Sequence, residues 1–174
     1  GAVVSSQKIV DNLWDLAKDF GGNLSDFSVW MLERSMKTLA IRVKAQQKNA
    51  RKLARFLEKH AAIEAVYYPG LKSHPNHDLA KTQMRGYGSM LSFQLYENYP
   101  ALSFLKSLNL IKPNMSLAGV ESTMIMPSKT SHALLSEADR KAQGISDQLI
   151  RFSVGIESKK DLIYDIKHAL NVCK

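Results

Sequence analysis

The sequence predicts an α+β fold in which helices pack on one face of a mainly antiparallel sheet, preceded by a long connecting helix. Apolar residues recur at helical spacing through residues 28–60. Several short runs rich in β-branched and aromatic residues follow, interleaved with capped helical segments. At 174 residues, of which 45% are apolar, the chain is long enough to bury one sizeable core.

The first expected element is one long amphipathic helix over residues 28–60. Before it, Ser25 or Asp26 can accept hydrogen bonds from the first free amide groups. The apolar positions at helical spacing are Val29, Leu32, Met36, Leu39, Val43, Ala50, Leu53 and Leu57. The many basic residues of this segment are expected to fill the remaining arc as an ordinary solvated face.

Five short segments after the helix are expected to be strands. They are residues 63–68, 89–96, 110–113, 122–127 and 148–155. In the second, Leu91, Phe93 and Leu95 are expected to face the core. Residues 71–77 are expected to form a surface loop. Helices are expected over 98–108, over 135–144 with a Ser136 cap, and over 157–172 with a Ser158 cap.

The overall composition excludes several classes of protein. No run of eighteen apolar residues and no secretory signal is present in the sequence, so we expect a cytoplasmic protein without membrane contact. The single cysteine, Cys173, allows no intrachain disulfide. The net charge of +8 invites a nucleic-acid partner. Without aromatic interleaving or a known binding motif, we expect none.

Most residues that could bind a metal or take part in catalysis do not match a known motif. His74 and His77 have the separation of two metal ligands on a helix, but Pro75 forbids that helix and no further ligand completes a site, so no metal is expected. His132 is a lone histidine, a type that is usually structural. The serines lack a nucleophile elbow and the glycines lack a phosphate-loop pattern.

Arg151 is the exception, because it lies within an apolar run of strand character. In strand geometry it shares one face with Leu149 and Ser153, opposite the apolar face. A buried guanidinium needs a partner. That partner can be one of the chain's own carboxylates, or a small carboxylate ligand gripped at two points. Ser116, in a turn of small residues, offers a hydroxyl to such a ligand.

Several stretches together resemble one family. "SLAGVES" at residues 116–122, "GISDQLIRFSVGIES" at 144–158 and "DLIYDIKHAL" at 161–170 resemble the C-terminal domain of the pyridoxal-phosphate enzymes of cysteine and methionine metabolism. "LERSMKTLAIRV" is similar to that family's "RGLKTL" helix, with Ser35 in place of a glycine, and residues 66–95 resemble the segment that follows. The resemblance, which is to the cystathionine synthase and lyase group, implies the small C-terminal domain of a fold-type I transferase.

The resemblance also implies roles for residues. Arg151 matches the arginine that binds the substrate α-carboxylate, and Ser116 matches the serine beside it. Met115 stands where many γ-synthases and γ-lyases have an acidic residue, which weakens recognition of the second amino group of cystathionine. The cofactor lysine and the other cofactor ligands of the family belong to its large N-terminal domain. We therefore expect no catalytic, cofactor-binding or metal-binding residue in this chain.

The implied organisation is a piece of a longer enzyme. Residues 1–27 would be the tail of the cofactor domain, 28–60 the interdomain helix and 61–174 the C-terminal domain. Alone the chain should be inactive and should bind no pyridoxal phosphate. The family implies a homotetramer of methionine biosynthesis and cysteine metabolism that acts on an amino acid: cystathionine, a homoserine ester or cysteine.

The reaction itself stays open. "SLAGVES", with Glu121 and Ser122, favours cystathionine γ-synthase or cystathionine β- or γ-lyase chemistry, in which a carbon–sulfur bond is formed or eliminated. Methionine γ-lyase and O-acyl-homoserine sulfhydrylase of the same family are alternatives. A non-catalytic α+β binding module is the alternative from another class.

Overall fold

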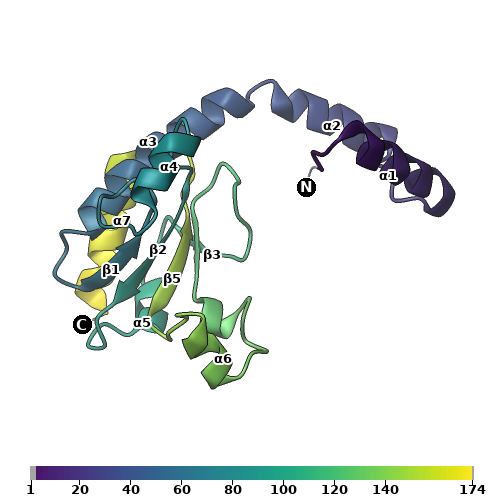
Figure 1. Ribbon diagram of the computed structural model, residues 1–174. Helices are drawn as coiled ribbons and strands as arrows, with labels where there is room; N and C mark the ends of the chain where they lie inside the picture. Colours follow the sequence, from purple (N-terminus) through teal and green to yellow (C-terminus); the bar gives the residue numbers. More distant parts are fainter. Residues whose placement is uncertain (1–2, 174) are drawn as a thin grey trace. The chain divides into compact units, whose positions relative to one another are not determined.

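The computed structural model describes residues 3–173 and forms two compact units, Gly1–Ala40 and Ile41–Lys174 (Figure 1). Each unit is described by itself. The domain boundaries expected at residues 27 and 60 stay a prediction, because a cluster of contacts does not show which part folds independently.

The first unit contains the helices α1 (Gln7–Phe20) and α2 (Asp26–Met36). Helix α2 begins as expected, because the Ser25 hydroxyl accepts from the amide of Ser28 at 3.3 Å. Helix α1 was not predicted from the sequence, in which residues 1–27 are assigned to the tail of the cofactor domain or a linker. Neither helix contains a buried residue.

The prediction of a single helix over residues 28–60 is wrong. Helix α2 ends at Met36, residues 37–38 form a turn, and α3 (Leu39–Leu57) follows. At the break, the Thr38 hydroxyl donates to the carbonyl of Ser35 at 3.4 Å. Threonine and serine side chains compete in this way for helical backbone groups, which explains why the hydrophobic repeat alone did not locate the turn.

Five strands form one sheet in the second unit. In the order of the chain they are β1 (Ile63–Tyr67), β2 (Met90–Leu95), β3 (Lys112–Pro113), β4 (Thr123–Ile125) and β5 (Leu149–Ser153). Their order across the sheet is β1-β2-β5-β4-β3. Three neighbouring pairs are antiparallel, but β3 and β4 are parallel. The sheet is therefore mixed and not mainly antiparallel, because the loop of residues 114–122 carries the chain back to the end of the sheet where β3 begins.

One face of the sheet packs against helices. Strand β2 contributes Leu91, Phe93 and Leu95, as expected, and β5 contributes Ile150 and Phe152, all of them buried. Against them lie α3, α5 (Ala101–Lys106) and α7 (Lys159–Val172), whose buried residues join the same core (Figure 1). The helical core residues are Ala50, Leu53, Ala54, Leu57, Ala101, Phe104, Leu105, Leu162, Ile166, Ala169 and Leu170. The alternating residues of β2 are only half-buried, so the other face, called the open face below, is partly accessible to solvent.

Three short elements complete the unit. Helix α6 (Glu137–Ala142) has its expected cap, because the Ser136 hydroxyl accepts from the Asp139 amide. Helix α4 (His77–Gln83) and the 3-10 helix η1 (Pro127–Lys129) were not expected. Among the residues that the structure describes, no helix combines the length and the apolar character needed to cross a membrane.

Asp165 joins α7 to the chain before β3. Its carboxylate is buried and accepts from the amides of Asn109, Leu110 and Ile111, at 2.8, 3.0 and 2.9 Å. Three backbone donors that would otherwise lack a partner are thereby satisfied. This carboxylate is therefore a structural group.

We expect Asp165→Ala to lower the free energy of unfolding by about 3 kcal/mol, because three amides of a partly buried segment lose their acceptor. Urea denaturation followed by circular dichroism measures it. Asp161→Ala, at an exposed position in the first turn of the same helix, is the control and should cost well under 1 kcal/mol. Equal losses for the two variants would contradict the role of Asp165.

Candidate functional site

Arg151 lies in the middle of β5 on the open face of the sheet. Its neighbours across the sheet are Ser92 on β2 and Ile125 on β4. Because Ile150 and Phe152 on either side of it are fully buried in the core, strand alternation directs Arg151 to the opposite face. The predicted assignment of faces along this strand is confirmed.

The guanidinium of Arg151 uses little of its hydrogen-bonding capacity. Its Nη2 atom donates to the carbonyl oxygen of Met115 at 2.8 Å. Its Nε atom is buried and has no hydrogen-bond partner among residues 3–173. In the described part of the chain no carboxylate forms a salt bridge with it, so the ion pair considered as its first alternative is not found. A buried donor without a partner costs about 1–3 kcal/mol, and a guanidinium forms its strongest hydrogen bonds with a charged acceptor.

Met115 and Ser116 lie in the loop between β3 and β4, residues 114–122. The Ser116 amide donates to the Oδ1 atom of Asn114 at 2.8 Å, and its carbonyl accepts from the Thr123 hydroxyl at 2.7 Å. Both main-chain groups of Ser116 are thus occupied within the loop. Its side chain is exposed. The structure therefore brings the Met115 carbonyl directly to Arg151, and Ser116 is the next residue of the same loop.

The far half of this loop is tied to β5 and to the residues that follow it. The amide of Ala118, which has a φ of 62°, donates to the Ser153 hydroxyl at 2.9 Å. The Ser122 hydroxyl accepts from the amide of Gly155 and donates to the carboxylate of Glu157, both at 2.9 Å. A non-glycine residue in the left-handed region costs about 1–2 kcal/mol, so the surrounding bonds must hold the loop in place.

Helix α3 adds a further support to the loop. Gln46 donates to the carbonyl of Gly119 at 2.6 Å, and Asn49 donates to the carbonyls of Gly155 and Glu157 at 3.1 and 2.8 Å. Both side chains are buried. These two positioning residues were not predicted from the sequence. The available signal was a pair of amide side chains next to the buried stripe of an amphipathic helix.

An apolar hollow adjoins the Arg151 site. It has a volume of about 240 Å³, and its lining includes Leu102, Met115, Ile125 and Lys129. Ile125 is the β4 partner of Arg151, and the Met115 side chain is 57% exposed. A carboxylate on the guanidinium can therefore extend an uncharged aliphatic chain into this hollow.

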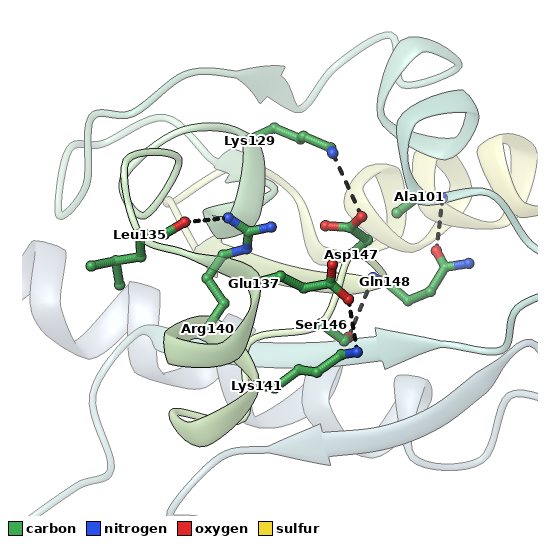
Figure 2. Close-up of polar contacts among 9 residues, drawn as sticks. All are labelled: Ala101, Lys129, Leu135, Glu137, Arg140, Lys141, Ser146, Asp147 and Gln148. Atoms are coloured by element: carbon green, nitrogen blue, oxygen red, sulfur yellow. Dashed lines mark hydrogen bonds and ion pairs between the residues drawn. The ribbon is translucent and has the colours of Figure 1, made fainter.

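A larger hollow of about 560 Å³ lies on the same open face, toward β1. It is lined in part by Tyr67, Gln94 and Arg140. Figure 2 shows the Nη1 atom of Arg140 donating to the carbonyl of Leu135 at 2.6 Å. This bond anchors Arg140 to the chain immediately before α6.

Two ion pairs border this larger hollow (Figure 2). Lys141 lies 2.7 Å from Glu137 and lowers the pKa of that carboxyl. Lys129 lies 3.5 Å from Asp147. The pKa of Asp147 is lowered first by the Ser128 hydroxyl and further by Lys129. Because all four ion-pair partners are largely exposed, the two pairs add little stability.

Two histidines considered in the sequence have contacts within the chain. The Nδ1 atom of His77 lies 2.8 Å from the carbonyl oxygen of Pro69, and its ring stacks on Tyr87 at 5.7 Å between centroids. His132 lies beside the Ser131 hydroxyl at 2.9 Å. Within residues 3–173 no group of three potential ligands could hold a metal ion.

Known proteins resemble this chain over nearly its whole length. A family model described as "Cys/Met metabolism PLP-dependent enzyme" matches residues 1–171. The cystathionine beta-lyase of Lactococcus lactis subsp. cremoris (strain MG1363) is 41% identical over 166 residues, which is 95% of this chain and 44% of that protein. The cystathionine gamma-lyase of Bacillus subtilis (strain 168) is 42% identical over 168 residues, 97% of this chain and 44% of that protein.

A solved structure of a related enzyme shows the same fold over nearly the whole of this chain. Cystathionine gamma-lyase from Lactobacillus plantarum, crystallised with L-serine, superposes with a TM-score of 0.94 at 34% identity, and covers 98% of this chain and 45% of that one. The chain therefore spans less than half the length of the relatives it matches.

A substitution at Gly155 tests how tightly the loop of residues 114–122 is held. A Cβ atom there would collide with the carbonyl oxygen of Val120 and lie 2.6 Å from the carbonyl carbon of Glu121. We expect Gly155→Ala to displace the loop and to lower the free energy of unfolding by about 2 kcal/mol, measured by urea denaturation. Faster hydrogen exchange at the amide of Ala118 would report the displacement directly.

Gly119→Ala is the matched control. A Cβ at Gly119 would meet only the side chain of Glu121, at 2.9 Å, and that flexible carboxylate can turn away. We expect this variant to keep the loop. The assigned role of Gly155 fails if both variants exchange alike.

Proposed function

Because the chain belongs to the Cys/Met metabolism PLP-dependent enzyme family, we propose that it is the substrate-carboxylate-binding part of a trans-sulfuration lyase. The reaction proposed for the longer enzyme is elimination at a carbon–sulfur bond of an amino acid. Similarity to a β-lyase and to γ-lyases supports a lyase over the γ-synthase and the sulfhydrylase. The proposed homotetramer and the cytoplasmic location rest on the family resemblance and the composition.

The unsatisfied guanidinium of Arg151 is the observation that carries this proposal. Its Nη2 atom donates to the Met115 carbonyl, and its buried Nε atom has no partner in the described part of the chain. A planar guanidinium is suited to a two-point contact with a carboxylate. The neighbouring Ser116 hydroxyl offers a further hydrogen bond to the same group. These residues would bind the α-carboxylate and so decide which bond at Cα is presented to the cofactor.

The pyridoxal phosphate of this family supplies the electron sink for the chemistry at Cα. The hollow next to Arg151 is mainly apolar, with Lys106, Lys129 and Thr130 also in its lining, and it suits a carboxylate that carries an aliphatic tail. This chain's residues therefore act on the substrate by binding and orienting it.

A methionine γ-lyase activity is the second candidate, and Met115 favours it. The exposed Met115 side chain lines the apolar hollow next to Arg151. That environment suits the uncharged thioether of methionine better than the charged far end of cystathionine. If the longer protein bound no pyridoxal phosphate, the non-catalytic binding module would replace both enzyme candidates.

We expect Arg151→Ala in the longer enzyme to raise KM and to lower kcat, with a loss in kcat/KM of about a hundredfold. Arg151→Lys should recover only part of it, because an ammonium group cannot make the two-point contact. Cofactor absorbance should be unchanged in both variants. Arg34→Ala, at an exposed position on α2, is the control. Wild-type kinetics for Arg151→Ala would remove the assignment.

Met115→Glu tests the choice of substrate. A carboxylate at this exposed position would attract the distal amino group of cystathionine and disfavour an apolar tail. We expect the ratio of kcat/KM for cystathionine to that for methionine to rise about tenfold, measured on both substrates with one enzyme preparation. Met115→Leu is the control and should leave the ratio near its original value. An unchanged ratio in Met115→Glu would show that this residue does not face the substrate tail.

A further inference from the structure

Helix α3 carries a line of positive charge on the side away from the core. From residue 35 to residue 57 the sequence has seven lysines and arginines and no aspartate or glutamate. Five of these cations follow steps of three and four residues, which places them on one side of a helix. They are Lys44, Lys48, Arg51, Lys52 and Arg55. All five are exposed, as expected for the solvated face of this helix.

A second segment turns this line of cations into a groove. The chain after α4 brings Arg85, Gly86 and Tyr87 to the helix, and the groove between them has a volume of about 470 Å³. A Cβ on Gly86 would overlap the Gln47 side chain of α3, so the two segments approach as closely as glycine allows. The cations are thereby gathered on both walls of one concave site, which the sequence could not predict.

The floor of the groove is held in place. Tyr68 is 1% exposed, and its hydroxyl donates to the carbonyl of Gly88 at 3.1 Å. Its ring meets Tyr87 edge-on at 6.4 Å between centroids. Burial raises the pKa of Tyr68 to about 12, although Arg51 opposes the shift. The phenol is therefore neutral at physiological pH and adds no negative charge to the groove.

The described residues supply no acidic partner to the cations of the groove. The residues that line the groove include no carboxylate. Across the described residues, no salt bridge involves Arg85 or any of the five helix cations. On the open face of the sheet, by contrast, Lys129 and Lys141 each have an acidic partner. Like charges at these helical spacings repel one another, and an external anion would relieve that repulsion.

We propose that this groove binds a small ligand that carries two or more linked phosphoryl groups. From Lys44 to Arg55 the line of cations is about 16 Å long at the helical rise, which is longer than one phosphate can contact. A volume of about 470 Å³ is in the range of small-molecule sites. The enclosing Arg85 segment favours a compact polyanion over a nucleic-acid duplex, which needs an open surface. This inference is independent of the Arg151 site and of the proposed lyase activity.

Isothermal titration calorimetry of the 174-residue chain with inorganic tripolyphosphate tests the proposal. We expect one tripolyphosphate per chain, with an affinity that falls as salt is added. The double variant Lys48→Glu/Arg51→Glu should weaken binding about tenfold or more, because two attractive charges become repulsive. Both positions are exposed, and circular dichroism should match the unmodified chain.

Lys8→Glu/Lys160→Glu is the matched control. It makes the same change in net charge at exposed positions in the first turns of α1 and α7, outside the groove. We expect this control to bind like the unmodified chain. Equal loss in both double variants would mean non-specific charge attraction and would overturn the proposal. So would the absence of saturable binding, or tighter binding of a short DNA duplex than of tripolyphosphate.

Discussion

Strand β5 carries the constraint on which the rest of the structure depends. Ile150 and Phe152 are fully buried against the helices, and the pleat then leaves Arg151 no position except the open face. From there the guanidinium fixes the Met115 carbonyl, and Ser153 two residues on fixes the Ala118 amide. The alternation of side chains along β5 thus determines both the packing of the core on one face and the geometry of the candidate site on the other.

The loop between β3 and β4 shows how a polar network replaces hydrophobic packing where a site must stay accessible. Ser122 and Glu157 satisfy one another, and buried amide side chains from α3 satisfy the carbonyls around them. Fully satisfied networks of this kind are rigid, because every alternative arrangement leaves a buried polar group without a partner. The loop can therefore keep Ala118 in an unfavourable backbone conformation while Met115 and Ser116 remain exposed.

The features best predicted from the sequence are those in which a hydrophobic period marks a buried face. Sequence reasoning located all five strands of the sheet, and it selected Arg151 from the conflict between a charge and an apolar run. It failed for the parallel β3–β4 pair, because two residues carry no readable period. It also missed Asp165 and Glu157, whose partners are backbone amides far away in the sequence. For the basic line of α3 the spacing was readable, but the opposing Arg85 segment was not.

The supports of the candidate site also bear on the order of folding. The bonds from Gln46 and Asn49 to the loop region close separations of 73 to 108 residues. Contacts of such long range form only after the chain entropy of large loops has been lost, which places them late in folding. The Arg151 site is consequently absent from any partly folded form that contains only local helices and the β1–β2 pair, and its assembly marks completion of the second unit.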